Sequence, residues 1–167
     1  GIGKADQLHL LIAPEHIHEA RARFVGGFGN VVDQRRVFER HPALKLVVHH
    51  HGALIPLFAQ RMQYGWDYFE QNTGIKQATP ISRPYIEHFR KFYCDTATQG
   101  NEPKVLEMTA AFFGPERVLF GSDAPMDASA GRSFTADAIA SVAGMGIPEA
   151  DRAKIFRGNA RRRLKLG

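Results

Sequence analysis

The chain has 167 residues, of which 44% are hydrophobic and 23% are charged. This size and composition predict one compact soluble domain over residues 1–167 and exclude a disordered chain. No stretch approaches the roughly 18 consecutive apolar residues of a transmembrane helix, and the first residues lack the layout of a secretory signal. We therefore expect a cytoplasmic protein with no membrane partner.

The formal charge is +5, from 22 Lys and Arg against 17 Asp and Glu, and much of the excess lies in RGNARRRLKL near the end of the sequence. Basic residues without interleaved aromatic residues are typical of a solvated helix end, so we expect no nucleic-acid partner. The competing hypothesis is a basic binding module that acts through Arg161, Arg162 and Arg163. The single cysteine, Cys94, excludes an internal disulfide and a Cys-rich zinc module, which fits a reducing compartment.

Four short apolar runs, bounded by polar residues or by Gly and Pro, predict β-strands at residues 8–13, 44–50, 91–97 and 117–123. Helical patterns fill the intervals, at residues 17–23, 31–40, 56–68, 103–113, 134–145 and 149–164. Residues 71–83 are rich in Gly, Pro, Ser, Thr and Asn and predict a loop. Pro148 is expected in the first turn of the last helix.

The apolar character of LKLVV and RVLFG is nearly continuous, which predicts strands covered on both faces. Such strands are parallel and are joined by helices, so the fold class is α/β. Four strand–helix units are about half of a (β/α) barrel, which takes roughly 250 residues in all. We predict a partial, TIM-type (β/α) barrel, and an open doubly wound sheet is the alternative with the same periodicity.

Polar residues follow three predicted strands, where parallel α/β folds gather their catalytic groups. LKLVV is followed by His49, His50 and His51, KFY by Cys94, Asp95 and Thr96, and RVLFG by Ser122 and Asp123. Each residue alone also fits a helix cap or a polar rim. Together, His and Asp at the ends of separate strands are the usual ligands of Zn²⁺ or Mn²⁺.

The segment KLVVHHHGALIPLFAQRM, followed in order by FYCDTA, ERVLFGSDAPMD and IFRGNARRRLKL, resembles the amidohydrolase-related superfamily. The similarity is to the branch that contains aminocarboxymuconate-semialdehyde and γ-resorcylate decarboxylases, and it covers residues 37–167. It implies that the chain is the C-terminal portion of such a barrel. It also implies a metal-dependent decarboxylase, or a hydrolase that uses nearly the same residues, acting on a small unsaturated or aromatic carboxylic acid. The expected metal is Zn²⁺, with Mn²⁺ as the alternative, and the expected assembly is a homodimer.

The resemblance also assigns roles to residues of this chain. His50, six positions before Pro56, matches the catalytic acid/base, and an imidazole with its ordinary pKa of about 6.5 exchanges protons near neutral pH. Asp123 matches the metal-ligating aspartate, which can also orient a metal-bound water in catalysis. Arg61 matches the arginine that binds a substrate carboxylate across a dimer interface. His49 is expected to point away from His50 along the strand, and the role of His51 is open.

The remaining metal ligands of the family come from its first strand, as an H-x-H or E-x-H pair, and from its fifth strand. His16 and His18 have H-x-H spacing just after the predicted strand 8–13, and on a strand they would share a face and a metal. The alternative is that EHIHEA begins an amphipathic helix, since Pro14 favours a strand that has already ended. A second hypothesis therefore covers the whole chain: a truncated or degenerate half-barrel without activity of its own, stabilised by oligomerisation that covers its edge strands.

Overall fold

The computed structural model describes residues 38, 41–72, 84–97 and 100–165. The chain divides into two compact units, residues 1–44 and 45–167, and the second contains all the helices and strands given below. The predicted strand 8–13 and helix 17–23 lie outside the described residues, as does the predicted helix 31–40 apart from Phe38. The expectation of one domain over the whole chain stays a prediction.

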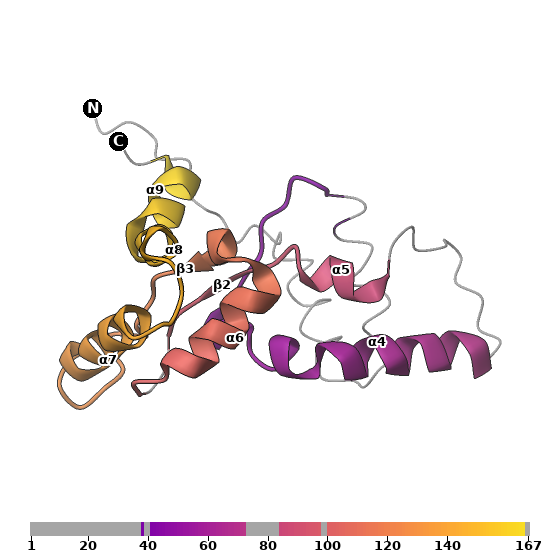
Figure 1. Ribbon diagram of the computed structural model, residues 1–167, viewed down its shortest axis with the longest axis horizontal. Helices are drawn as coiled ribbons and strands as arrows, with labels where there is room; N and C mark the ends of the chain where they lie inside the picture. Colours follow the sequence, from indigo (N-terminus) through magenta and orange to yellow (C-terminus); the bar gives the residue numbers. More distant parts are fainter. Residues whose placement is uncertain (1–37, 39–40, 73–83, 98–99, 166–167) are drawn as a thin grey trace, which may run out of the picture. The chain divides into compact units, whose positions relative to one another are not determined.

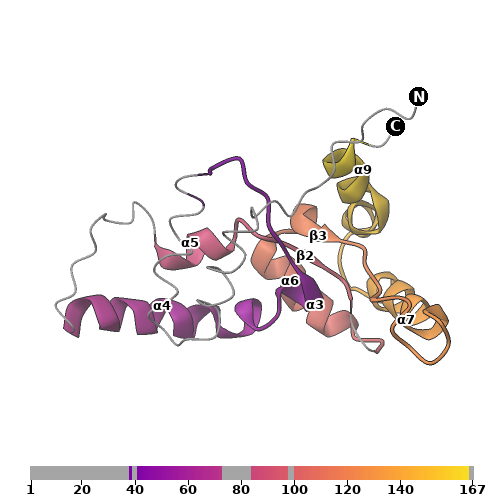
Figure 2. The same ribbon diagram turned by 180° about the vertical axis from the view of Figure 1, so that it is seen from behind.

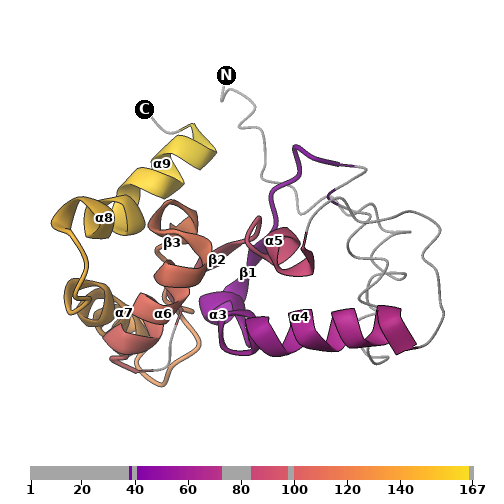
Figure 3. The same cartoon turned by 45° about the vertical axis from the view of Figure 1, so that its right-hand side comes forward.

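Three short parallel strands form the sheet of the second unit, in the order β1, β2, β3 (Figure 3). They are β1 (Val47–Val48), β2 (Tyr93–Asp95) and β3 (Val118–Leu119). β1 pairs with the first two residues of β2, and β3 pairs with the last two. All three lie inside predicted strands, and their parallel order confirms the predicted α/β class.

Helices connect the strands (Figure 1), and their bounds are α3 (His49–Gly52), α4 (Ile55–Asn72), α5 (Tyr85–Phe89), α6 (Pro103–Phe113), α7 (Arg132–Ala143), α8 (Glu149–Ala153) and α9 (Asn159–Leu164). A 3-10 turn, η2 (Pro115–Arg117), precedes β3, and a π-helical segment, η3 (Lys154–Gly158), joins α8 to α9. Pro148 occupies the N-cap position of α8, one residue earlier than predicted. None of the helices in the described residues combines the length and apolar character needed to cross a membrane.

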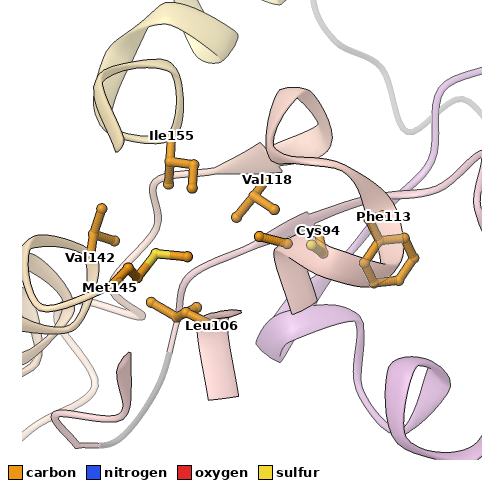
Figure 4. Close-up of a cluster of buried hydrophobic side chains, with 8 residues drawn as sticks. Cys94, Leu106, Phe113, Val118, Val142, Met145 and Ile155 are labelled. Carbon is orange, nitrogen blue, oxygen red and sulfur yellow. The ribbon is translucent and has the colours of Figure 1, made fainter. Parts of the chain in front are cut away.

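The hydrophobic core lies between the sheet and the helices that follow β2 and β3 (Figure 4). Its buried members are Cys94, Leu106, Ala110, Phe113, Val118, Val142, Met145 and Ile155. Full burial of a side chain the size of leucine or isoleucine stabilises a fold by about 1.5–3 kcal/mol. The core therefore fixes β2 and β3, and with them the polar residues at their carboxyl ends.

The edge of β3 that faces away from β2 is bonded to the C-terminal helical segment. The buried Asn159 donates from Nδ2 to the carbonyl of Val118 at 2.7 Å, and the Phe120 N–H donates to the carbonyl of Ile155 at 3.1 Å. The carbonyl of Leu119, between them, accepts a bond from the β2 side. Because backbone groups alternate in direction along a strand, the Val118 and Phe120 groups point to the outer edge. Their partners in the C-terminal segment satisfy both groups.

Candidate active site

Three polar residues lie at the carboxyl ends of the three parallel strands. His50 follows β1, Asp95 ends β2, and Asp123 comes four residues after β3. Figure 2 shows the short helix α3, which contains His50, beside β2. In parallel α/β folds the carboxyl ends of the strands form the face where catalysis takes place. His50 and Asp123 are therefore at the carboxyl end of the sheet, together with Asp95, which sequence analysis counted among the polar residues after the strands but gave no role of its own.

The turn after β1 has an unusual backbone. His50 has φ 52° and ψ 64°, His51 has φ 60° and ψ 22°, and Gly52 and Ala53 have φ 78° and 54°. A residue other than glycine in this left-handed region adds about 1–3 kcal/mol of backbone strain, so neighbouring groups must stabilise the conformation. The expectation that His49 points away from His50 is wrong. The strand ends at Val48, strand alternation stops there, and the rings of His49 and His50 meet edge to face with centroids 4.4 Å apart.

A hydrogen-bonding side chain from β2 holds this turn. Asp95 Oδ1 accepts the His50 N–H at 2.8 Å and the Ala97 N–H at 3.1 Å. The Nδ1 atom of His50 lies 3.4 Å from the Ala97 carbonyl oxygen. In the tautomer that donates from Nδ1 to this oxygen, Nε2 carries the lone pair that accepts a proton. Because the His50 side chain is exposed, it can exchange that proton with solvent.

A second contact joins the ends of β2 and β3. The buried Thr96 donates from Oγ1 to the Gly121 carbonyl at 2.9 Å and accepts the Gly121 N–H at 3.1 Å. A Cβ atom on Gly121 would lie 3.1 Å from the Cβ of Asp95, so the absence of a side chain here lets the two strand ends approach closely. Asp123 follows two residues later, partly exposed and with φ 62°.

His51 is the buried histidine of the three, with 8% of its surface exposed. Burial lowers the pKa of His51 below the ordinary value of 6.5, against the nearby Asp95 carboxylate, which acts to raise it. Its Nε2 atom is buried without a hydrogen-bond partner, and its carbonyl accepts the hydroxyl of Thr109 on α6 at 3.4 Å. His51 therefore packs as a neutral side chain beneath the turn that presents His50.

Arg61 lies on the surface of α4, away from this hydrogen-bonding network. It is exposed on the same helix stripe as Leu57, Tyr64 and Tyr68, whose side chains are 61%, 71% and 58% exposed. The part of the chain that the structure describes contains no hydrogen bond or ion pair between Arg61 and His50 or Asp123. The structure thus places the predicted carboxylate-binding residue on an outward-facing helix surface.

The predicted metal site is incomplete in the described part of the chain. Within residues 38, 41–72, 84–97 and 100–165, no three His, Cys, Asp or Glu side chains are grouped so that they could hold one metal ion. Asp123 supplies one carboxylate, and the predicted ligands His16 and His18 lie outside the described residues. Burial raises the pKa of the Cys94 thiol far above its ordinary range, so this sulfur stays protonated and is a poor ligand.

The loop between Asp123 and α7 is built around Asp127. Its carboxylate accepts the N–H groups of Ser129, Gly131 and Phe134 and the hydroxyl groups of Ser129 and Ser133, at 2.7–2.9 Å. The backbone hydrogen bond from Phe134, with the other donors, holds the pKa of Asp127 well below its usual range. Sequence analysis did not single out this residue, although an aspartate followed closely by Ser and Gly before a helix is typical of an Asx turn.

The basic C-terminal segment makes contacts within the fold. The Arg163 guanidinium lies 4.7 Å from the ring centroid of Tyr93, and Arg162 donates to Asn159 Oδ1 at 2.8 Å. Two of the three arginines of the binding-module hypothesis therefore pack against, or bond to, elements of the core.

Comparison with known proteins identifies the family. The sequence model of the amidohydrolase family matches residues 16–166, which is most of the chain. This chain belongs to the amidohydrolase family. Among curated relatives, the γ-resorcylate decarboxylase of Rhizobium radiobacter is 29% identical over 134 residues, which cover 78% of this chain and 37% of the relative. The chain thus spans a little over a third of the length of the curated relatives it matches.

Solved structures agree with this assignment. The 5-carboxyvanillate decarboxylase of Sphingomonas paucimobilis aligns with a TM-score of 0.68 and 27% identity, over 83% of this chain and 39% of that one. The dihydroxybenzoic acid decarboxylase of Polaromonas sp. JS666, solved with manganese and the inhibitor 2-nitroresorcinol, aligns with a TM-score of 0.61 and 27% identity. That alignment covers 93% of this amidohydrolase chain and 47% of its neighbour. The predicted resemblance to the decarboxylase branch and the predicted partial (β/α) barrel are both confirmed.

Proposed function

We propose that this chain is the C-terminal portion of a metal-dependent decarboxylase of an aromatic carboxylic acid, with His50 as the acid/base. The observation that carries the proposal is the exposed His50 at the carboxyl end of a parallel sheet, with its backbone N–H bonded to Asp95 and its ring Nδ1 3.4 Å from the Ala97 carbonyl oxygen. The matched relatives act on dihydroxybenzoic acids and 5-carboxyvanillate, which are aromatic acids. These substrates are therefore the class to test first.

The residues divide the work of the reaction as follows. His50 delivers a proton to the ring carbon that bears the carboxylate, the bond from that carbon to the carboxyl group breaks, and its electron pair returns to the ring as carbon dioxide leaves. His50 is then reprotonated from solvent, to which its side chain is open. Arg61 would bind a carboxylate through its planar pair of N–H donors, supplied to the site from its exposed position on α4.

A divalent metal ion would be held by Asp123 together with ligands outside the described residues, for which His16 and His18 are the candidates. When bound, such an ion polarises substrate oxygen atoms and stabilises the negative charge that develops on them. The Polaromonas relative was solved with manganese, so Mn²⁺ is the ion to test alongside the Zn²⁺ expected from sequence.

The test combines turnover with metal content. We expect the chain, supplied with Mn²⁺, to release carbon dioxide from a dihydroxybenzoic acid. The variant His50→Asn should lose turnover but keep its metal, because asparagine tolerates the positive φ of this position and cannot shuttle protons. Asp123→Ala should lose metal and turnover together, and Asp137→Ala on α7 is the matched control that should lose neither. Normal turnover in His50→Asn would rule out the acid/base role.

A second candidate function is favoured by the incomplete metal site. The described residues supply no three-ligand cluster. On this reading the chain is a degenerate half-barrel without activity of its own, stabilised by oligomerisation. Elemental analysis and solution mass separate the two proposals, because this one predicts a metal-free, inactive oligomer.

We further propose that the chain forms a homodimer through the exposed stripe of α4, and that it works in the reducing cytoplasm. The stripe combines the apolar surfaces of Leu57, Tyr64 and Tyr68 with the guanidinium of Arg61. Aromatic residues and arginine are enriched in protein interfaces over other surface. A dimer at this stripe would bring Arg61 toward the partner subunit, which is the role that its family resemblance implies.

A further inference from the structure

We infer that Asp95 is a positioning residue, whose carboxylate holds the His50 imidazole in the orientation that proton transfer requires. The inference rests on the proposed role of His50 and extends it to a residue on a different strand. Asp95 is 45 positions from His50 in sequence, yet its Oδ1 atom accepts the His50 backbone N–H at 2.8 Å. This bond ties the end of β2 directly to the turn after β1.

The first argument concerns the backbone. His50 and His51 both have positive φ angles, which residues with a side chain rarely adopt unless neighbouring groups enforce them. The His50 N–H lies at the start of this turn, and Asp95 is its hydrogen-bond acceptor. Removing the acceptor leaves the turn free to relax toward an ordinary conformation. The direction in which the His50 side chain leaves the backbone would change with it.

The second argument concerns the imidazole ring. The same carboxylate oxygen accepts the N–H of Ala97 at 3.1 Å, and the carbonyl oxygen of Ala97 lies 3.4 Å from His50 Nδ1. One oxygen of Asp95 therefore fixes both His50 and the residue whose carbonyl faces its ring. A proton held on Nδ1 by that carbonyl leaves Nε2 as the nitrogen that exchanges protons with a substrate.

The third argument concerns the place of Asp95 in the fold. Its Cβ would be 3.1 Å from a Cβ on Gly121, so its side chain lies against the segment that leads to Asp123. Its neighbour Thr96 exchanges two hydrogen bonds with Gly121. Asp95 thus occupies a position between the proposed acid/base and the proposed metal ligand, where it can fix their relative placement.

The test compares Asp95→Asn, which keeps an acceptor oxygen in a side chain of the same size, with Asp95→Ala, which removes it. Long-range ¹H–¹⁵N spectra of histidine-labelled chain, at about pH 8.5 so that imidazoles are neutral, report which ring nitrogen carries the proton. His50→Asn identifies the His50 signals by their loss. We expect the Nδ1–H form to dominate in the unaltered chain and in Asp95→Asn, and a mixture with the Nε2–H form in Asp95→Ala.

The His50 amide should also exchange with solvent about 10-fold faster in Asp95→Ala, as a hydrogen bond worth about 1.4 kcal/mol requires. Asp137→Ala is the control and should change neither readout.

Where the chain turns over a dihydroxybenzoic acid, kcat should fall about 10- to 100-fold in Asp95→Ala, with KM changed by less than about 2-fold. Asp95→Asn should recover most of the loss.

Ring signals and amide exchange of Asp95→Ala that match the unaltered chain would overturn the inference, as would an Asp95→Asn variant that behaves like Asp95→Ala. These spectra do not depend on turnover, so an inactive chain with the expected spectra contradicts the proposed function and leaves the positioning role standing. If Asp95→Ala does not fold, Asp95→Glu displaces the same oxygen by one carbon, and unchanged His50 signals in that variant overturn the inference.

Discussion

Gly52 occupies the one position in the His50 turn where a side chain has no room. Its φ is 78°, and a Cβ atom there would lie 2.5 Å from Cε2 of Phe113 and 2.6 Å from Cζ. We expect Gly52→Ala to destabilise the chain by about 2–4 kcal/mol, because backbone strain adds to overpacking of a buried ring. Urea unfolding followed by circular dichroism measures this loss.

Gly100→Ala is the matched control for that prediction. Its Cβ would be 4.0 Å from the nearest atom, the Cγ of Glu102, and its φ is not in the left-handed region. The same added methyl group should therefore change the free energy of unfolding by less than about 1 kcal/mol. Equal effects of the two substitutions would show that the steric argument for Gly52 is wrong.

His51 predicts a pH dependence of stability. Burial lowers its pKa in the folded chain, while the unfolded chain has the ordinary value of 6.5. Above 6.5 neither state binds the proton, and the contribution of His51 to stability is fully present. As the pH falls below 6.5, the unfolded state binds a proton at His51 and the folded state does not. The free energy of unfolding therefore decreases until the pH reaches the lowered pKa of the folded chain.

The measurement compares thermal unfolding of the unaltered chain and His51→Asn between about pH 7.5 and 5. Asparagine tolerates the positive φ at this position and does not titrate. The melting temperature of the variant should fall less steeply toward acid than that of the unaltered chain. A slope unaltered in His51→Asn would contradict the assignment.

At the scale of the elements, Asn159 joins the last helix to β3, the strand that leads to Asp123. It is fully buried, and its Nδ2 donates to the carbonyls of Pro115 and Val118, both at 2.7 Å. Asn159→Asp has the same shape but no donor. It should destabilise the chain by about 2–5 kcal/mol, since two buried carbonyls lose their donor and face a carboxylate.

The exposed Asn101 provides the comparison for Asn159. Its Oδ1 atom accepts the Ser141 hydroxyl at 3.5 Å, and an aspartate would keep that acceptor. Asn101→Asp should therefore unfold within about 0.5 kcal/mol of the unaltered chain. An Asn159→Asp variant as stable as Asn101→Asp would mean that the two short hydrogen bonds contribute little.

How far sequence predicts these elements depends on how local their causes are. Helix α6 (Pro103–Phe113) has the predicted bounds because proline at its start and Gly114 after its end are signals within the helix itself. The predicted strand 44–50 forms a ladder only over Val47–Val48, since the chain turns at His49. That turn depends on an acceptor from β2, which no local pattern reveals. Helix α4 likewise runs two residues into the predicted loop 71–83.

The same distinction applies to the candidate site. The rule that polar groups follow the carboxyl ends of parallel strands applies to each strand separately, and it predicts that His50 and Asp123 both lie at that end of the sheet. Which histidine of the three is buried depends instead on packing against α6 and β2, so the burial of His51 could not be read from HHH alone. The hydrogen bond between Asp95 and His50 also depends on the register between β1 and β2, which only the three-dimensional structure shows.

At the scale of the whole molecule, the surface of α4 predicts association. Leu57 and Tyr64 are 61% and 71% exposed on the same stripe as Arg61, and large exposed apolar side chains grouped in this way mark interaction sites. A tyrosine at the centre of an interface commonly contributes 2 kcal/mol or more to binding. We expect the chain of 18.6 kDa to show a dimer mass that dissociates on dilution.

The double variant Leu57→Lys and Tyr64→Lys should weaken that dimer by about 10-fold or more in Kd, because lysines opposite their copies repel and lose apolar contact. Light scattering and sedimentation equilibrium over a range of concentrations measure the change. Ile139→Lys on α7, which places the same charge on another exposed apolar residue, should leave Kd as it is. A dimer that persists in the double variant but dissociates in Ile139→Lys would show that the interface lies on α7 and not on α4. Arg61 could then not bind a substrate in the partner subunit.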